Sequence, residues 1–179
     1  MTKIFLLLFL LVPSELSAEY KNTSGTALEK SFSDMVKWIR SDQEPKLSSI
    51  EISSEWEELN LLEDDNYAVW IGHSTFLIKK NGITILTDPI FSDRASPFKR
   101  IGPKRLIPAA IDLKAIPKID FVTVSHNHYD HLDIHSLISI SKNHPDAIFL
   151  VPAGDRDILK RKRIKNVHEF EWWESFKDD

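Results

Sequence analysis

The 179-residue chain is 42% hydrophobic and 28% charged, which is enough for one modest domain with a hydrophobic core. Its formal net charge of −4 gives no overall basic field, so nucleic acid is not expected as a partner. Because cysteine is absent, disulfides and thiolate metal ligands are excluded, and any metal ion must be held by His, Asp or Glu.

The N-terminus has the composition of a secretory signal peptide. Lys3 precedes an apolar run over residues 4–12, and the small residues Ser17 and Ala18 suit a cleavage site. The run is too short to span a bilayer as a helix. We therefore expect residues 1–18 to be removed on export to the periplasm or the medium. An uncleaved membrane anchor is the alternative.

Residues 19–66 are expected to form a helix followed by a connecting arm. Apolar residues recur at helical spacing between residues 26 and 40, and Ser24 can cap the start of that helix. Residues 41–66 are polar and acidic, so they predict an arm with little regular structure. Trp56 is expected to attach this arm to the following domain.

The domain over residues 67–179 begins with an antiparallel sheet. Residues 67–71, 75–78 and 83–87 have the composition of strands. Asn81-Gly82, between the second and third of them, is a strong hairpin signal. Residues 88–117 hold five of the nine prolines and predict a long ordered loop that shapes a binding face.

The rest of the chain alternates strands with helices. Residues 119–124 predict a buried strand, and Asp133 can cap the helix that follows. Further elements are expected as a strand at 147–151, a short helix at 155–162 and an aromatic strand from 167.

A cluster of three imidazoles and a carboxylate follows the strand at 119–124. His126, His128, Asp130 and His131 lie within six positions. Chance would produce this pattern on the order of once in a thousand such chains. Imidazole nitrogen and carboxylate oxygen are ligands for zinc and similar divalent cations. The sequence therefore predicts a metal site, and a metal site of this type implies a hydrolase.

The spacing of the cluster suggests two ions. His126 and His128 project to the same side of an extended backbone, so both can bind one ion. Asp130 and His131 lie where the chain turns toward a helix and can bind a second ion, about 3.5–4 Å from the first. Because four ligands cannot complete two tetrahedral shells, further ligands must come from elsewhere.

These residues resemble the signature of the metallo-β-lactamase superfamily. The resemblance is closer still to its N-acylphosphatidylethanolamine phospholipase D branch and the bacterial relatives of that branch. The segments that carry it are residues 70–75, 86–92, 94–97, 101–105 and 125–133. The likeness runs from about Met35 to the C-terminus.

The resemblance implies an α/β protein with the αββα sandwich of this superfamily, of which the chain holds only the first half. The remaining ligands of the family, a His, a bridging Asp and a final His, lie beyond the first cluster and have no counterpart here. We therefore expect a fragment of a longer protein, the product of a truncated gene, or a chain that a second chain completes. Alone, it is expected to be inactive.

The resemblance also implies roles for particular residues. His126 and His128 would bind one zinc ion, and Asp130 and His131 a second. Asp130 would in addition orient the water that attacks a phosphodiester. Asp88 would support the histidine loop from outside the ligand set. His73 is a further candidate that could equally pack beside the site.

Three functions remain open at this point. The first is an exported zinc-dependent phosphodiesterase of phospholipase D type, acting on N-acylphosphatidylethanolamine or related phospholipids. The second is a lactonase or other esterase of the same fold. The third is a non-enzymatic remnant. Peripheral membrane contact through basic clusters and a homodimer of the full-length protein are further hypotheses about partners, although a solvated surface is the usual role of such clusters.

Overall fold

The computed structural model describes residues 33, 37, 55–64, 66–98, 100 and 102–176. The chain divides into two units, Met1–Leu47 and Ser48–Asp179, and the second holds the strands described below. The predicted signal peptide and most of the predicted helix at 26–40 lie outside the described residues, although Ser33 and Lys37 are both helical. Within the described ranges, no helix has the length and apolar character needed to cross a membrane.

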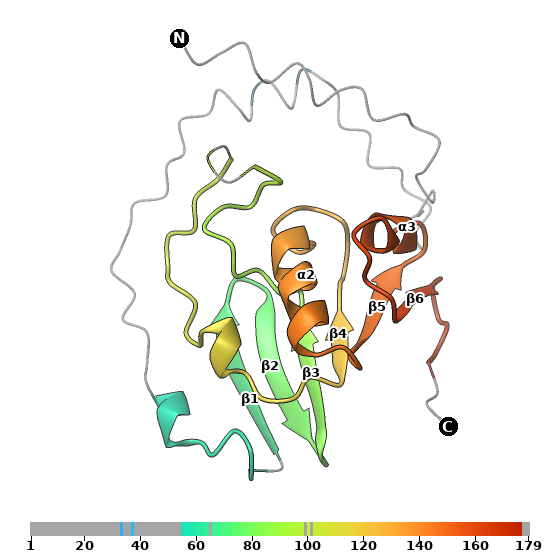
Figure 1. Cartoon of the computed structure of the whole chain (residues 1–179). Coiled ribbons are helices and arrows are strands. Elements are labelled where there is room, and N and C mark those ends of the chain that lie inside the picture. The colour runs from blue at the N-terminus through green and yellow to red at the C-terminus, as the bar shows by residue number, and fades with distance from the viewer. Residues whose placement is uncertain are drawn as a thin grey trace. The chain divides into compact units, whose positions relative to one another are not determined.

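Six strands form one mixed sheet in the order β1-β2-β3-β4-β5-β6 (Figure 1). They are β1 (Asn66–Gly72), β2 (Thr75–Lys80), β3 (Ile83–Thr87), β4 (Phe121–Thr123), β5 (Ile148–Pro152) and β6 (Val167–Phe170). β2 is antiparallel to both β1 and β3, whereas β3 to β6 are parallel to one another. All strands except β2 therefore end at the same edge of the sheet, which we call the carboxyl edge.

The predicted antiparallel sheet and its hairpin are confirmed. Asn81 and Gly82 connect β2 to β3 with φ angles of 51° and 80°, the left-handed backbone that a tight hairpin turn requires at both positions. β2 continues to Lys80, two residues past its predicted end, because Lys80 pairs with Ile83 directly across the turn.

β4 is shorter than the strand predicted there, but its hydrogen bonding extends further. Only residues 121–123 of the predicted strand at 119–124 form β4. The backbone N–H of Asp120 nevertheless donates to Thr84 O at 3.0 Å, and that of Val124 to Leu150 O at 2.9 Å. The strand therefore remains tied to both neighbours up to the residue before the histidine loop.

From residue 55 on, the described part of the chain has two helices and two 3-10 turns beside the strands. They are η3 (Glu55–Glu58), η4 (Leu113–Ala115), α2 (Ile134–Asn143) and α3 (Arg156–Lys160). Asp133 caps α2 as predicted, because its side chain accepts from the backbone N–H of His135 at 3.2 Å. α3 ends two residues before its predicted limit, and the chain then turns through Arg163, whose φ is 66°.

The core lies between the sheet and the helices. Val122 and Phe149 from the central strands pack in one cluster with Leu137 of α2 and Leu159 of α3, and α2 lies in front of the sheet in Figure 1. Trp56 packs against this cluster, as the sequence predicts. On the other face of the sheet, alternate side chains remain exposed, among them Trp70, Phe76 and Ile83.

The predicted long loop at 88–117, in the residues that the structure describes, runs along the carboxyl edge. Its Ala110 N–H donates to Ile71 O at 3.0 Å, and its Ser92 N–H donates to Asp133 Oδ2 at 3.0 Å. The Arg105 guanidinium, half-buried in the loop, donates to the carbonyl of Ile90, and burial lowers its pKa. The loop is therefore attached to both the end of β1 and the start of α2.

Candidate metal centre

Four strands deliver polar side chains to the carboxyl edge. His73 follows β1, Asp88 follows β3, residues 125–131 follow β4, and Asp155 follows β5. Because these strands end at the same edge, residues that are far apart in sequence meet there. The edge of a parallel sheet is where α/β folds place their ligand sites.

Asp88 is held in a fixed position at the end of β3. Asp88 is only 7% exposed, and its backbone carbonyl accepts a hydrogen bond from the buried Thr75 hydroxyl at 2.8 Å. Its φ is 36°, a left-handed conformation that costs on the order of 1 kcal/mol in a non-glycine residue. Its carboxylate accepts from the backbone N–H of Ser125 at 2.7 Å and from the Ser125 hydroxyl at 2.8 Å.

Asp88 and Ser125 together orient two of the histidines. Asp88 Oδ2 lies 2.9 Å from His131 Nδ1, so the second ring nitrogen of His131 faces away from this pair. Ser125 Oγ lies 3.0 Å from His126 Nδ1. Partners of this kind on the outer ring nitrogen fix the orientation of metal-binding histidines. The structure thus places Asp88 where the family resemblance implies a supporting carboxylate.

Three imidazoles, those of His126, His128 and His131, lie close together with their rings edge-on or tilted to one another. His126 Nε2 lies 3.1 Å from His128 Nδ1, and the ring centroids of His126 and His131 are 4.0 Å apart. Burial lowers the pKa of His126, and the neighbouring His131 and His128 lower it further. A neutral imidazole is the form that binds metal, so the cluster itself keeps His126 ready to act as a ligand.

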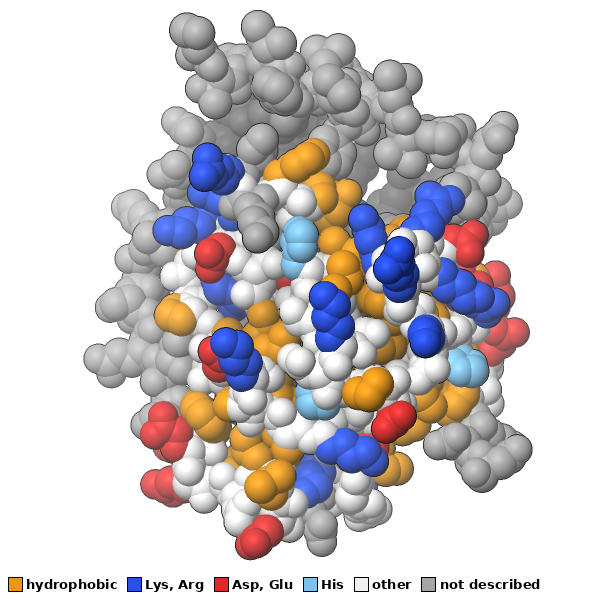
Figure 2. Space-filling view, viewed as in Figure 1, with side chains coloured by type: hydrophobic (Ala, Val, Ile, Leu, Met, Phe, Trp, Pro, Cys, Tyr) orange, Lys and Arg blue, Asp and Glu red, His pale blue; other side chains and the backbone are white. Residues whose placement is uncertain are grey.

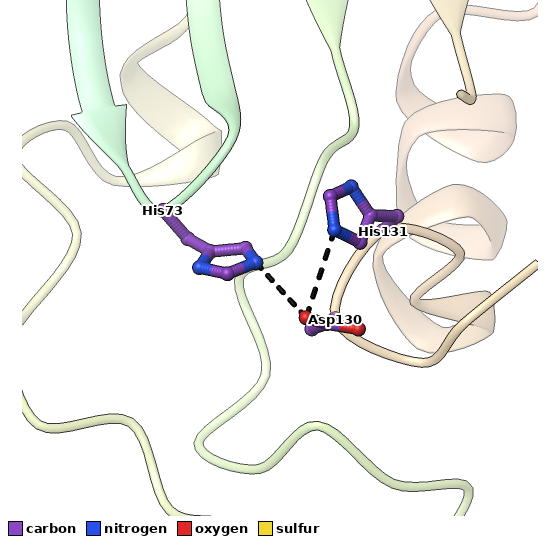
Figure 3. Close-up of side chains that lie close together, drawn as sticks. All are labelled: His73, Asp130 and His131. Atoms are coloured by element: carbon purple, nitrogen blue, oxygen red, sulfur yellow. Dashed lines mark hydrogen bonds and ion pairs between the residues drawn. The ribbon is translucent and has the colours of Figure 1, made fainter. Parts of the chain in front are cut away.

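His73 lies in the turn between β1 and β2 and faces Asp130 and His131 (Figure 3). Its Nε2 lies 3.0 Å from Asp130 Oδ2, and the same oxygen is 3.6 Å from His131 Nε2. One ligand atom from each of these three residues lies within 4.8 Å of the other two. Figure 3 shows the His73 and His131 rings on either side of the Asp130 carboxylate. The structure therefore adds His73 to the pair that the sequence assigns to the second ion.

The charge of Asp130 is favoured by its surroundings. Burial raises its pKa, but a backbone hydrogen bond and the nearby His131 and His73 lower it by more, so the net pKa lies below the ordinary value. Asp130 is therefore an anion at neutral pH, which is the form that binds a cation or accepts a proton from water.

The donor set fits a divalent cation such as zinc. It consists of imidazole nitrogens and carboxylate oxygens, with His126 and His128 as one adjacent pair and His73, Asp130 and His131 as a second group. His126 Nε2 and His128 Nδ1, 3.1 Å apart, can share one proton in a hydrogen bond or face one cation together. The assignment of each residue as a ligand stays a prediction.

Sequence reasoning missed one contact of the histidine loop. Asn127, between His126 and His128, donates through Nδ2 to Asp155 Oδ1 at 2.9 Å. Asp155 was expected only as part of a helix. Its position directly after β5, at the edge where β4 delivers the histidines, is the signal that could have indicated this contact.

Comparison with known proteins identifies the family. Residues 84–179, more than half of the chain, match the β-lactamase superfamily domain. The chain belongs to the metallo-β-lactamase superfamily. Within it, the chain is similar to N-acyl-phosphatidylethanolamine-hydrolyzing phospholipase D 1 of Caenorhabditis elegans, with 38% identity over 118 residues, covering 63% of this chain and 33% of the relative. It falls in this phospholipase D-like branch of the superfamily, as the sequence resemblance implies.

A second curated relative is similar to this chain over about the same share of its length. The mitochondrial N-acyl-phosphatidylethanolamine-hydrolyzing phospholipase D of Saccharomyces cerevisiae is 41% identical over 110 residues, covering 61% of this chain and 23% of that protein. The chain thus spans about a quarter to a third of the length of these two relatives. Among solved structures, CmlA, a diiron β-hydroxylase from Streptomyces venezuelae, superposes with a TM-score of 0.49 at 23% identity, covering 64% of this chain and 22% of CmlA.

Proposed function

We propose that this chain carries the first metal-binding half of a zinc-dependent phosphodiesterase of phospholipase D type. The observation that supports this most directly is the meeting of His73, His126, His128, Asp130 and His131 at one edge of the sheet. The proposed substrates are N-acylphosphatidylethanolamine or related phospholipids, because the two curated relatives described above are named for hydrolysing that lipid.

The chemistry follows from the donor set. A divalent cation bound here would lower the pKa of a water toward 7 and stabilise negative charge that develops on a phosphodiester. His126 and His128 would hold one cation, and His131, with Asp130 and His73, a second. Asp130, anionic and half-exposed, is placed to accept a proton from the attacking water or to orient it. Because five protein ligands do not fill two tetrahedral shells, the complete site needs ligands from a further segment or chain.

The loop beside the site suits an amphiphilic, anionic substrate. Phe98 and Leu106 on this loop are 54% and 55% exposed, and the exposed Arg100 and Lys104 lie close to them in sequence. The loop is attached to the end of β1 and the start of α2, next to the cluster. Apolar and cationic side chains together match the acyl chains and phosphate of a phospholipid. A lactone, the substrate of the alternative esterase function, carries no charge for Arg100 and Lys104 to bind.

The experiment measures hydrolysis of N-acylphosphatidylethanolamine by this chain together with the segment or chain that supplies the remaining ligands, after loading with zinc. We expect release of phosphatidic acid from N-acylphosphatidylethanolamine vesicles, and we expect His128→Ala to abolish it while His135→Ala leaves it unchanged. His135 is an exposed histidine of α2 outside the cluster. Hydrolysis of an N-acyl homoserine lactone alone would support the esterase alternative, and zinc binding without turnover of either compound would support a non-enzymatic remnant.

We also propose peripheral contact with anionic membranes through a second basic surface. Lys and Arg side chains gather over α2 and α3 in Figure 2. They comprise Lys142, Lys160, Arg161, Lys162, Arg163 and Lys165. Lys142 and Lys160 lie in the last turns of α2 and α3, where a cation compensates the helix dipole. Lys162, Arg163 and Lys165 lie beyond both helices, so that explanation does not apply to them.

A cavity lies among these cations. It has a volume of about 460 Å³ and is lined by Lys142, Lys162, Arg163 and Lys165 together with Ile138, Ser141, Pro145 and Ile164. Each Lys or Arg near an anionic bilayer contributes about 1 kcal/mol to binding. We expect the protein to bind phosphatidylglycerol vesicles with an affinity that falls as the salt concentration rises. The double variant Lys162→Glu/Lys165→Glu should bind these vesicles at least about tenfold more weakly. Lys80→Glu/Lys114→Glu is the matched control, and equal loss in both double variants would contradict the proposal.

A further inference from the structure

Asp155 is a buried carboxylate with no role in the donor set. The residue is only 4% exposed, and it occupies the N-cap position of α3. N-cap aspartates normally accept a hydrogen bond from the first turn of their helix. The Asp155 side chain makes no such bond. Its burial therefore serves something other than the helix that it precedes.

The partner of Asp155 is the histidine loop. Asp155 Oδ1 accepts from Asn127 Nδ2 at 2.9 Å, and Asn127 stands between His126 and His128 in the sequence. A single amide donor thus connects the end of β5 to the middle of the segment that follows β4. Among the contacts described for this loop, the Asp88 and Ser125 bonds reach His126 and His131, and the Asn127 bond holds the residue between His126 and His128.

The position of Asp155 is itself fixed by its neighbours. Glu169 of β6 accepts through Oε1 from the backbone N–H groups of Gly154, at 3.0 Å, and Arg156, at 2.8 Å. The N–H of Asp155 donates to Pro152 O at 3.1 Å. The residues on both sides of Asp155 are therefore tied to β6, so its carboxylate offers a rigid acceptor.

Burial disfavours the charged form of Asp155, and no capping hydrogen bond from α3 compensates for this. Burial raises the pKa of Asp155, and the nearby Glu169 raises it further, against the lowering effects of Asn127 and His126. Carboxylates with perturbed pKa values cluster at functional sites. Conversion of Asp155 to a small apolar residue would leave the Asn127 amide without its partner.

We propose that Asp155 is a positioning residue, which acts through Asn127 to hold His126 and His128 at the spacing needed to share one cation. The inference rests on the proposed metal-dependent function. Asp155 contacts neither the cation nor substrate. It sets the backbone between two ligands, in the way that residues around a metal site govern affinity without binding the ion.

The test is zinc affinity, measured by competition with a chromophoric chelator, in this chain and five variants. Asp155→Ala and Asn127→Ala should each weaken zinc binding by about tenfold. The double variant should be no weaker than the more affected single variant, since both changes break one contact. Asp155→Asn, which keeps an oxygen acceptor for Asn127, should restore most of the affinity.

Asp157→Ala is the matched control, because Asp157 is an exposed aspartate two residues further on in α3. The absorption spectrum of the cobalt-substituted chain should change in Asp155→Ala and Asn127→Ala and stay unchanged in the control. Asn127 is exposed, so Asn127→Ala keeps the test decisive if Asp155→Ala fails to fold.

Different results would contradict the metal-dependent function and the positioning role of Asp155. If the unmodified chain shows no saturable zinc binding, the proposed metal-dependent function fails and this inference with it. If the unmodified chain binds zinc but Asn127→Ala and Asp155→Ala bind it equally well with unchanged cobalt spectra, or if the single effects add in the double variant, the positioning role alone is overturned.

Discussion

Asp88 and His131 are 43 residues apart in sequence, yet Asp88 Oδ2 lies 2.9 Å from His131 Nδ1. The contact connects the end of β3 with the end of the histidine loop after β4. It also determines which nitrogen of His131 is available to a cation, because Nδ1 is engaged by the carboxylate. The orientation of His131 therefore depends on Asp88, which the predicted ligand set leaves out.

Asp88→Asn should weaken zinc binding about 10–100-fold. The neutral amide removes the charge that supports His131, and its NH₂ group cannot accept from both Ser125 donors. Equilibrium titration with zinc measures the change. Asp93→Asn, at an exposed aspartate of the same loop, should bind zinc as the unmodified chain does. An unaltered zinc affinity in Asp88→Asn would show that Asp88 is an ordinary turn residue.

His73→Ala tests the residue that the structure adds to the second group of ligands. His73 Nε2 lies 3.0 Å from Asp130 Oδ2, so we expect the variant to lose affinity for the second ion by at least tenfold, roughly, and to retain the first ion. Cobalt titration followed by absorption separates the two ions. His135→Ala provides the comparison. Equal stoichiometry and affinity in both variants would mean that His73 only packs beside the site.

Local patterns in the sequence account for the elements, whereas the contacts of the site needed the order of the strands. Asn81-Gly82 predicts its hairpin because the left-handed backbone at two successive positions has few sequence solutions. Asp133 predicts the start of α2 for a similarly local reason. The Asn127 to Asp155 bond joins residues 28 apart and exists only because β4 and β5 are neighbours. No local pattern encodes that adjacency.

His73 illustrates an intermediate case. The family resemblance placed it near the site, but residue type and spacing alone could not distinguish a ligand from a packing residue. The structure brings it to Asp130 because β1 is parallel to β3, through the shared antiparallel partner β2. Its φ of 51° belongs to the tight turn between β1 and β2, as the same angle at Asn81 belongs to the next hairpin.

Phe149→Ala should destabilise the fold by about 3–5 kcal/mol, because it leaves a cavity in a well-packed core. Phe149 of β5 is 1% exposed and belongs to the main cluster. Phe98→Ala is the matched change at a ring that is 54% exposed, where the effect should stay within about 0.5 kcal/mol. Urea unfolding measures both. Similar losses in the two variants would contradict the described packing of the sheet against the helices.

Asp120→Asn should lower the thermal midpoint at pH 7 by about 2–4 °C, as expected for a loss near 1 kcal/mol. Asp120 accepts from Thr84 N–H at 2.8 Å and pairs with Lys118 at 2.6 Å. Burial raises its pKa, but the Lys118 and Thr84 contacts lower it by more, so the folded pKa lies below the ordinary value.

A depressed carboxyl pKa stabilises the fold above the unfolded value of about 3.9, and this contribution is lost as the pH falls through the folded pKa. The difference between the unmodified chain and Asp120→Asn should therefore shrink below about pH 4. Thermal unfolding from pH 3 to pH 7, with Asp157→Asn as control, measures it. A difference that stays constant over this range would contradict the assignment.

The central claim is that the histidine cluster binds divalent cations, and equilibrium zinc titration of the unmodified chain, His128→Ala and His135→Ala tests it most directly. We expect saturable zinc binding, weaker than that of a complete site, in the unmodified chain and in His135→Ala, with most of that affinity lost in His128→Ala. Absence of saturable binding in the unmodified chain, or equal binding by His128→Ala, would contradict the claim.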